Sequence, residues 1–259
     1  MGRRPEAPVA LVTGASRGIG RAVALALGAA GFTLVLGARS LGDLDELVRQ
    51  IAAAGGNATA SALDVRDHLS VEGFVQDALD RFGRVDLLVA NAGIGGGDLF
   101  ASMSQQDVRG LVETNFLGVL RSVQLVLPAM RRQHRGSIVI VASVAGEVAL
   151  PGSALYAATK AALMRFADGL GREVRADGVR VTAILPGFVR TDMTRGIGLP
   201  MPGPEVVARA VLRAYRQGPR RIVVPGFYVV LIWLARAAPW LVDLVGRRIL
   251  REMAEKTPG

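Results

Sequence analysis

The segment APVALVTGASRGIGRAVALALGAA, residues 7–30, decides the fold of this chain. Its first part, Ala7 to Val12, carries no charge and is typical of a short buried strand. A glycine-rich turn, Thr13 to Gly20, follows at once and leads into a helical run from Arg21 to Ala30. Such a turn lets a pyrophosphate approach the backbone and bind at the helix N-terminus. The segment therefore predicts a dinucleotide-binding unit at the start of the chain.

Three glycines of this turn have distinct expected tasks. Gly14 permits the tight turn, Gly18 the close approach of a phosphate, and Gly20 the packing of the helix against the sheet. The alternative is a glycine-rich turn without a ligand. Because a strand lies directly before the turn and a helix directly after it, the ligand-binding interpretation is favoured.

Strand-like and helix-like runs alternate along the rest of the chain, which predicts a parallel sheet with helices on both faces. We expect about seven strands in a doubly wound α/β order, with ligands at their carboxyl ends. Residues 1–259 are expected to form a single domain, with residues 226–259 as its C-terminal helical extension. The later expected strands are Thr33–Gly37, Ala58–Leu63, Val85–Ala90, Ser137–Ala142, Val179–Leu185 and Arg221–Val224, and the later helices are Leu41–Ala54, Asp67–Phe82, Gln105–Arg135, Ser153–Ala176 and Pro204–Gln217.

The second half of the chain contains a phenol and an ammonium at a spacing that allows them to act together in acid-base catalysis. Tyr156 and Lys160 are four residues apart, so they share one face of a helix. A phenol with a pKa near ~10 is a poor acid-base group at neutral pH, and a neighbouring ammonium lowers that pKa. The spacing alone is also typical of a solvated helix face. A dinucleotide site in the same domain favours the chemical interpretation.

The glycine spacing Gly-x-x-x-Gly-x-Gly, together with Asn91-Ala92-Gly93, Ser143 and the Tyr156/Lys160 pair, resembles the short-chain dehydrogenase/reductase family. The resemblance extends from about residue 7 to about residue 225, with the motifs in the family's order and Ser143 thirteen residues before Tyr156. It implies a Rossmann-like fold and a nicotinamide-dependent oxidoreductase that interconverts carbonyl and alcohol groups.

The resemblance also implies catalytic roles for four residues. Tyr156 would protonate a substrate carbonyl oxygen, Ser143 would polarise it, and Lys160 would lower the phenol pKa and hold the nicotinamide ribose. Asn115, in the segment Thr114–Gly118, matches the asparagine that kinks its helix in the family and connects the proton relay to solvent. Taken alone, Ser143 is also typical of a turn cap, and Asn115 of an ordinary helix residue.

Two arginines favour NADPH over NADH. Arg39 follows the second expected strand, at the position where an Asp or Glu would bind the ribose 2′-hydroxyl and repel a 2′-phosphate. Arg17 lies inside the glycine-rich turn, and two guanidinium groups suit a phosphate dianion. The resemblance points the same way, because these positions are basic in NADPH-preferring members. The alternative is that both arginines are merely exposed side chains in an arginine-rich chain.

The resemblance extends the cofactor site along the carboxyl ends of further strands. Asp64 and Val65 match the position that holds the adenine ring, and the segment Pro186–Thr191 matches the one that binds the nicotinamide carboxamide. The complete expected set of cofactor contacts is Gly14, Ser16, Arg17, Gly18, Ile19, Gly20, Arg39, Asp64, Val65, Asn91, Ala92, Gly93, Tyr156, Lys160, Pro186, Gly187, Val189 and Thr191.

Composition narrows the remaining classes of function. The formal net charge is +9, and Lys160 and Lys256 are the only lysines. The arginines are spread along the chain without a long basic run, which indicates a solvated surface rather than a nucleic-acid site. The chain has no cysteine, and His68 and His134 lie far apart, so neither thiolate chemistry nor a metal site is expected. No apolar secretory segment opens the chain, so a cytoplasmic location is expected.

The chain ends in an apolar extension. Its first apolar run, Phe227 to Ala235, is well short of the ~20 residues that a spanning helix needs, and Arg236 and Pro239 interrupt the longer stretch. Three interpretations are open. The extension packs over the substrate cleft or a neighbouring subunit, lies in a membrane interface with both tryptophans and Arg247-Arg248 near the headgroups, or is a plain core helix.

The first two interpretations of the extension suggest an apolar, lipid-like or steroid-like carbonyl substrate. The leading hypothesis is therefore an NADPH-dependent carbonyl reductase or alcohol dehydrogenase. Its rivals are an NADP(H)-binding sensor without turnover and a membrane-peripheral scaffold. The resemblance implies a homodimer or homotetramer that pairs through the two long helices. The expected substrate wall contains Ser143, Glu147, Leu150, Pro151, Leu155 and Tyr156.

Overall fold

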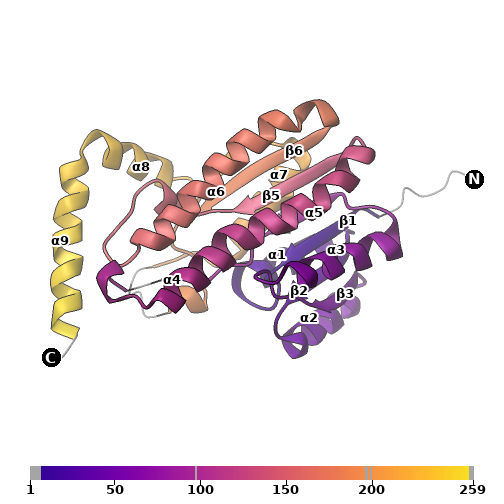
Figure 1. Ribbon diagram of the computed structural model, residues 1–259, viewed down its shortest axis with the longest axis horizontal. Coiled ribbons are helices and arrows are strands. Elements are labelled where there is room, and N and C mark those ends of the chain that lie inside the picture. The colour runs from indigo at the N-terminus through magenta and orange to yellow at the C-terminus, as the bar shows by residue number, and fades with distance from the viewer. Residues whose placement is uncertain (1–6, 97, 196–197, 199, 257–259) are drawn as a thin grey trace, which may run out of the picture.

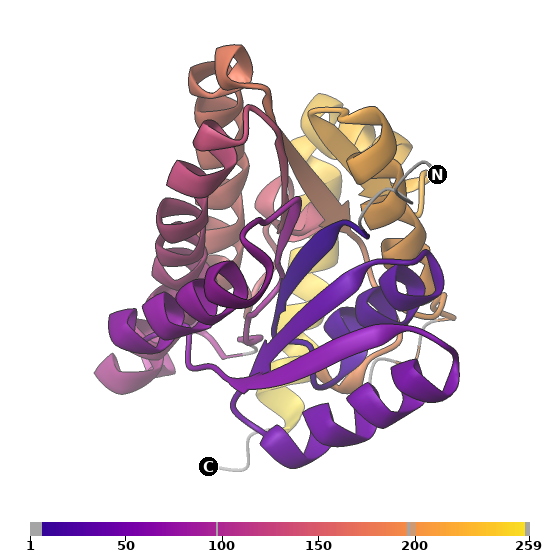
Figure 2. The same ribbon diagram turned by 90° about the vertical axis from the view of Figure 1, so that its right-hand side faces the viewer.

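A seven-stranded parallel sheet forms the centre of the molecule, with helices on both of its faces (Figure 1; Figure 2). The computed structural model describes residues 7–96, 98–195, 198 and 200–256. The strand order β3-β2-β1-β4-β5-β6-β7 confirms the doubly wound α/β fold. The strands are β1 (Val9–Thr13), β2 (Thr33–Ala38), β3 (Asn57–Ala62), β4 (Leu87–Ala90), β5 (Gly136–Val141), β6 (Val179–Pro186) and β7 (Arg221–Val224).

The strand order reverses between β1 and β4, which pair in parallel with Ala10 opposite Leu87 and Val12 opposite Val89. From β1 the chain builds β2 and β3 on one side, then crosses to β4 and continues toward the other edge. In open α/β sheets, ligands bind outside the carboxyl ends of the two strands at which the order reverses.

The helices largely follow the expected ranges, with one interruption. The expected helix Gln105–Arg135 is divided by a π-helical turn, η2 (Glu113–Leu117), and ends at Arg132. Asn115 lies in that turn, at the point where the family resemblance implies a kink. The helices are α1 (Gly18–Ala29), α2 (Leu41–Ala53), α3 (His68–Phe82), α4 (Gln105–Val112), α5 (Gly118–Arg132), α6 (Ala154–Glu173), α7 (Glu205–Gln217), α8 (Tyr228–Ala237) and α9 (Pro239–Lys256).

Two apolar cores lie on opposite faces of the sheet. Val9 and Leu11 of β1 face the core that α3, α5 and α6 cover, whereas Ala10 and Val12 face the core under α1, α2 and α7. Alternate residues of a strand point to opposite faces, so a strand that is buried on both must be apolar throughout. This explains why the first strand was recognisable as an uninterrupted apolar run.

The C-terminal helices lie outside these layers. Figure 1 shows α8 and α9 at one end of the molecule, with α9 standing away from the sheet. No residue of α8 is buried. The interpretation of the extension as a plain core helix is therefore wrong, because the helices α1 to α7 already cover both faces of the sheet.

Candidate active site

The glycine-rich turn has the geometry of an anion cradle. Helix α1 begins at Gly18, its N-cap Arg17 is extended, no side chain caps it, and no acidic residue lies in its first turn. Its first backbone N–H groups therefore lack the side-chain acceptor that usually caps a helix, and they carry the positive end of the helix dipole. A diphosphate fits this position, and a nicotinamide dinucleotide would supply one.

Each of the three glycines is required by the local backbone. Gly14 and Gly18 have positive φ angles of 67° and 55°, which side chains rarely adopt. A Cβ on Gly14 would lie 2.8 Å from the Cα of Ala92, and one on Gly20 would collide with the carbonyl oxygen of Gly14. Of the other expected contacts here, Ser16 and Ile19 are half-buried and Arg17 is exposed.

The asparagine after β4 locks this turn in place. The Nδ2 atom of Asn91 donates to the carbonyl oxygens of Thr13 and Gly14, both at 3.1 Å. In return, the Thr13 hydroxyl accepts from the backbone N–H groups of Asn91 and Ala92, also at 3.1 Å. Asn91 belongs to the expected site, whereas a role for Thr13 was not expected, although its position between strand and turn is the available signal.

Lys160 is buried against the sheet, one helical turn from Tyr156. Its Nζ atom donates to the carbonyl oxygen of Val141 at 2.9 Å and lies 5.6 Å from the centroid of the Tyr156 ring. Gly93 lies beside it, because a Cβ at that position would be 3.6 Å from Nζ. The structure thus brings Tyr156 and Lys160 together with the end of β5 and the triplet after β4.

Burial sets the protonation of both groups. Burial raises the pKa of the Tyr156 phenol, and a hydrogen bond with Ser143 acts in the opposite direction. Burial lowers the pKa of Lys160 to about 8. Desolvation of the phenolate is the larger effect, so the net shift of the phenol pKa is upward, opposite to the lowering that the Tyr156/Lys160 spacing suggested. Tyr156 therefore keeps its proton at neutral pH.

Ser143 lies at the end of β5, next to the phenol. Its hydroxyl accepts from the backbone N–H of Ala145 at 3.1 Å and lies 3.4 Å from the carbonyl oxygen of Pro186. It therefore does cap the following short turn, as its position also allowed, and it contacts Tyr156 as well. The Ser143 hydroxyl therefore contacts the turn after β5, the last residue of β6 and the phenol of Tyr156.

Asn115 is fully buried in the π-helical turn and binds the segment after β4. Its Oδ1 atom accepts from the backbone N–H of Ile94 at 2.8 Å, and its Nδ2 atom donates to the Ile94 carbonyl oxygen at 2.9 Å. A Cβ on Gly93 would lie 3.3 Å from Oδ1. The side chain of Asn115 therefore holds the strand-end segment that borders Lys160.

The adenosine side of the expected cofactor site is basic at its surface. Arg39 is exposed directly after β2, and Nη1 of exposed Arg17 lies 3.9 Å from a carboxylate oxygen of Asp192. The Arg66 guanidinium, 2.6 Å from Asp64, lowers the pKa of that carboxyl below its usual range. The carboxylate of Asp64 is therefore already paired within the chain.

The segment after β6 passes close to the glycine-rich turn. Val189 is buried in the core, and its carbonyl oxygen accepts from the hydroxyl of Thr194 at 2.7 Å. A Cβ on Gly18 would lie 3.4 Å from a methyl group of Thr191. The backbone of Gly187 packs against the ring of Tyr228 from α8, a contact that sequence analysis did not foresee.

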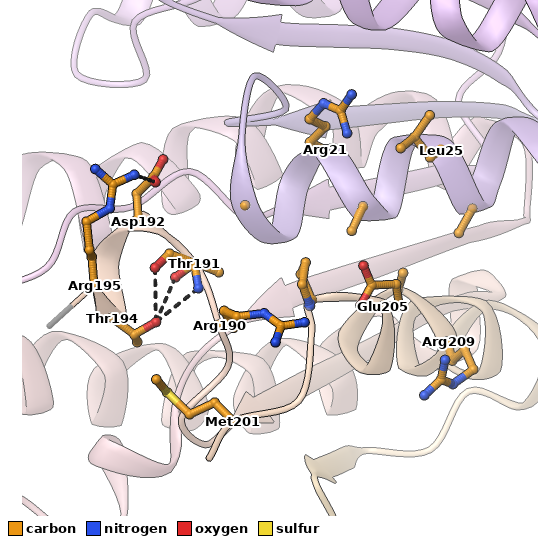
Figure 3. Close-up of a pocket in the computed structure, with 15 residues that line it drawn as sticks. Arg21, Leu25, Arg190, Thr191, Asp192, Thr194, Arg195, Met201, Glu205 and Arg209 are labelled. Carbon is orange, nitrogen blue, oxygen red and sulfur yellow. Dashed lines mark hydrogen bonds and ion pairs between the residues drawn. The ribbon is translucent and has the colours of Figure 1, made fainter. Parts of the chain in front are cut away.

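A cleft of about 930 Å³ runs between α1 and the segment that leads into α7 (Figure 3). It touches the glycine-rich turn at Gly18 and Thr191, but neither Tyr156 nor Lys160 lines it. The cleft therefore adjoins the phosphate end of the expected cofactor site and is not the place where the catalytic side chains meet. Arg21, Arg190, Arg195 and Arg209 give its walls several positive charges.

Glu147 anchors the C-terminal extension instead of facing an open cleft. Its carboxylate pairs with Arg221 of β7 at 3.0 Å and with Arg236 of α8, and Arg221 also pairs with Asp168 of α6. Glu147 therefore ties α8 to the sheet, and its contact with a substrate stays a prediction. Leu150, Pro151 and Leu155 are half-buried in the neighbouring loop and helix start, and Pro151 borders Gly246 of α9.

Comparisons with known proteins agree with this geometry. The family model of the short chain dehydrogenases matches residues 8–200. A 3-oxoacyl-[acyl-carrier-protein] reductase of Synechocystis sp. is 41% identical over 192 residues, which cover 74% of this chain and 78% of that protein. A short-chain dehydrogenase structure from Streptomyces avermitilis superposes with a TM-score of 0.82 at 33% identity, covering 96% of this chain and 99% of that one.

A second solved structure bears on the cofactor. An alcohol dehydrogenase from Thermococcus sibiricus, complexed with 5-hydroxy-NADP, superposes with a TM-score of 0.77 at 31% identity. The superposition covers 85% of this chain and 96% of that chain. The likeness thus includes a protein whose structure holds an analogue of a phosphorylated nicotinamide dinucleotide.

Proposed function

Because the chain belongs to the short-chain dehydrogenase/reductase family, we propose that it is an NADPH-dependent reductase of a ketone or aldehyde group on an apolar substrate. The same groups run the reverse oxidation of the alcohol. The observation that carries the proposal is the arrangement of Tyr156 beside Ser143 and the buried Lys160 at the end of β5.

The phenol is the proton donor in this proposal. Burial keeps Tyr156 protonated at neutral pH, which is the form that reduction of a carbonyl requires. The Ser143 hydroxyl, at the same strand end, donates to the carbonyl oxygen as negative charge develops there. When bound, the reduced nicotinamide supplies the hydride that reaches the carbonyl carbon.

Lys160 and Asn115 act behind the phenol. Lys160, with a pKa of about 8, exchanges its proton within the working pH range and can return one to Tyr156. Asn115 holds the backbone of Ile94 through two hydrogen bonds and thereby fixes the segment that borders the lysine. In this proposal Tyr156 transfers the proton to the substrate, Lys160 returns a proton to Tyr156, and Asn115 holds the segment beside Lys160 in position.

NADPH is the proposed cofactor. The uncapped start of α1 and the three required glycines suit its pyrophosphate. Exposed Arg17 and Arg39 lie on the adenosine side, where each can turn toward a 2′-phosphate and pair with it bidentately. The alternative for these arginines, that they are only surface charges, predicts equal binding of NADH and NADPH.

The proposed substrate carries its carbonyl on an apolar body. The loop that precedes α6 offers Leu150 and Pro151, and both carboxylate oxygens of nearby Glu147 are paired with arginines. This wall therefore presents little free charge to a substrate. The 3-oxoacyl group in the name of the Synechocystis relative has this character when its acyl chain is long. We further propose a homodimer or homotetramer that pairs through α4, α5 and α6.

The test is NADPH oxidation with a panel of carbonyl compounds, from small ketones and quinones to 3-oxoacyl thioesters, steroids and retinoids. We expect turnover with apolar members and a loss of at least ~100-fold in Tyr156→Phe, which removes only the hydroxyl. NADPH affinity, measured by fluorescence titration, should stay within about twofold in this variant, because the cradle is intact. Binding of NADPH without turnover of any carbonyl would favour a sensor.

A further inference from the structure

The two C-terminal helices and the residue before them carry most of the large apolar side chains that are exposed in the described part of the chain. We propose that α8 and the first half of α9 insert into the surface of a lipid bilayer that contains anionic phospholipids. Eleven of the seventeen large apolar side chains that are exposed among the described residues lie between Phe227 and Leu250. They are Phe227, Val229, Val230, Leu231, Trp233, Leu234, Trp240, Leu241, Leu244, Val245 and Leu250.

The apolar surface of α8 is too wide for a single protein partner. Tyr228, Ile232 and Ala235 are half-buried and share the face that points to the protein. At 100° per residue, the exposed apolar side chains from Val229 to Leu234 spread over about 200° of the helix circumference. A helix that packs against one neighbour needs an apolar stripe of only ~100°. A lipid environment, in contrast, covers an exposed helix from every open side.

The charge pattern along the extension fits an anionic membrane surface. Between residues 226 and 251 the only acidic residue is Asp243, whereas four arginines lie in this range, at 236, 247, 248 and 251. The exposed side of α9 then changes from Trp240, Leu241 and Leu244 in its first turns to arginines at 247, 248 and 251. Tryptophan favours the interface of a bilayer, and arginine binds its anionic headgroups. Apolar and basic side chains in this order match a helix that enters the interface and leaves it again.

The geometry indicates insertion along the surface rather than a straight crossing. Among the described residues, no single helix is long and apolar enough to span a membrane. Within the described ranges, only α8 and residues 239–251 together reach the required length and composition, and their axes meet at 103°. A corner of this kind places two short apolar segments at shallow depth.

This surface is tied to the proposed active site. The hydroxyl of Tyr228 accepts from the backbone N–H of Phe188 at 3.1 Å, in the segment that follows β6. Arg236 pairs with Glu147, the residue that directly follows the short turn that Ser143 caps. The lipid-facing helices therefore sit beside the wall that we propose for an apolar substrate, so a substrate dissolved in the bilayer would have a short path to the site.

The chain offers an internal probe of this proposal. Trp233 and Trp240 are its only tryptophans, and both are about two-thirds exposed, at 66% and 65%. Vesicles of phosphatidylcholine and phosphatidylglycerol in equal amounts should shift their emission to shorter wavelength and carry the full-length protein into the pellet on sedimentation. Vesicles of phosphatidylcholine alone should bind more weakly. Adding salt should release the protein in part, because exposed charges are screened.

Two sets of variants separate the apolar and the electrostatic contributions. Val230→Glu combined with Leu244→Glu should weaken vesicle binding at least about tenfold, because each side chain leaves the lipid. Leu69→Glu, at a leucine of α3 that is even more exposed, is the matched control and should bind as the parent does. Arg247→Glu combined with Arg251→Glu should abolish the preference for phosphatidylglycerol.

Two results would overturn the proposal. In the first, the tryptophan emission does not respond to vesicles, and the protein stays in the supernatant. In the second, the tryptophans are already shielded in solution, and the Val230→Glu/Leu244→Glu variant changes the oligomeric state in analytical ultracentrifugation, so a second copy of the chain covers the surface. Neither measurement involves turnover, so the proposed reductase activity stands or falls separately.

Discussion

Replacing Lys160 by methionine should abolish activity and make the protein more stable at neutral pH. The ammonium of Lys160 is buried, and its hydrogen bond to the Val141 carbonyl oxygen is the only one found for it among the described residues. Methionine has a similar volume and length but no charge to desolvate. The expected gain therefore measures how much free energy of unfolding the protein loses by burying an ammonium at this position.

The magnitude follows from the pKa of Lys160, which burial lowers from 10.5 to about 8. At about 1.4 kcal/mol per pH unit, holding the charged form in the folded state costs about 3 kcal/mol below pH 8. The lost hydrogen bond to Val141 offsets about 1 kcal/mol of the relief. We therefore expect Lys160→Met to be about 2 kcal/mol more stable than the parent at about pH 6.5.

The sign of the pH dependence is fixed by the direction of the shift. Between pH 8 and 10.5 the unfolded lysine binds a proton that the folded one has lost, so the stability of the parent rises with pH in this window. The advantage of Lys160→Met should consequently shrink by about 2 kcal/mol between about pH 6.5 and about pH 9.5. Urea denaturation of both proteins at the two pH values measures it. A variant that is less stable at both, or a difference that does not change with pH, would refute the reasoning.

Three further substitutions test other parts of the account. Gly20→Ala places a methyl group against the backbone of the glycine-rich turn and should lower the free energy of unfolding by about 1–3 kcal/mol, as measured by thermal denaturation. Gly42→Ala, in open space, is the control and should cause no loss of stability. Equal melting temperatures of the two variants would contradict the packing argument. Arg39→Asp should weaken NADPH binding at least about tenfold in a fluorescence titration and leave NADH binding nearly unchanged, so an equal loss for both would remove Arg39 from the 2′-phosphate site. Asn115→Ala leaves both backbone groups of Ile94 without their partners and should cost about 2 kcal/mol or more in urea denaturation; a smaller loss would mean that the segment rearranges.

The fold could be predicted from the sequence because the central strands β1, β2, β4 and β5 are buried on both faces. Such strands are uninterrupted apolar runs, and in this chain they alternate with helical runs, so both the fold class and the strand ranges were recognisable. The division of the expected helix Gln105–Arg135 was visible only through the family resemblance at Asn115. A π-helical turn changes the hydrogen-bond pattern without a proline or a glycine cluster to mark it.

The candidate site could be predicted in its residue types but not in its electrostatics. Spacing brought Tyr156 and Lys160 to one helix face, yet the direction of the phenol pKa depends on burial, which the spacing does not contain. The ion pairs of Glu147 join residues 74 and 89 positions apart, which no local pattern reveals. For the same reason the contact of Tyr228 with the segment after β6 could not be foreseen.

Hydride transfer to a carbonyl carbon is the central claim, and isotope transfer tests it most directly. NADPH that carries deuterium at the transferable position of the nicotinamide, in each of its two stereochemical forms, is incubated with the protein and the carbonyl panel, and the alcohols are analysed by mass spectrometry. We predict one deuterium on the carbinol carbon with one of the two forms, and at least about a hundredfold less labelled alcohol with Tyr156→Phe. Bound cofactor without label in any alcohol, or equal labelling by Tyr156→Phe, would contradict the account.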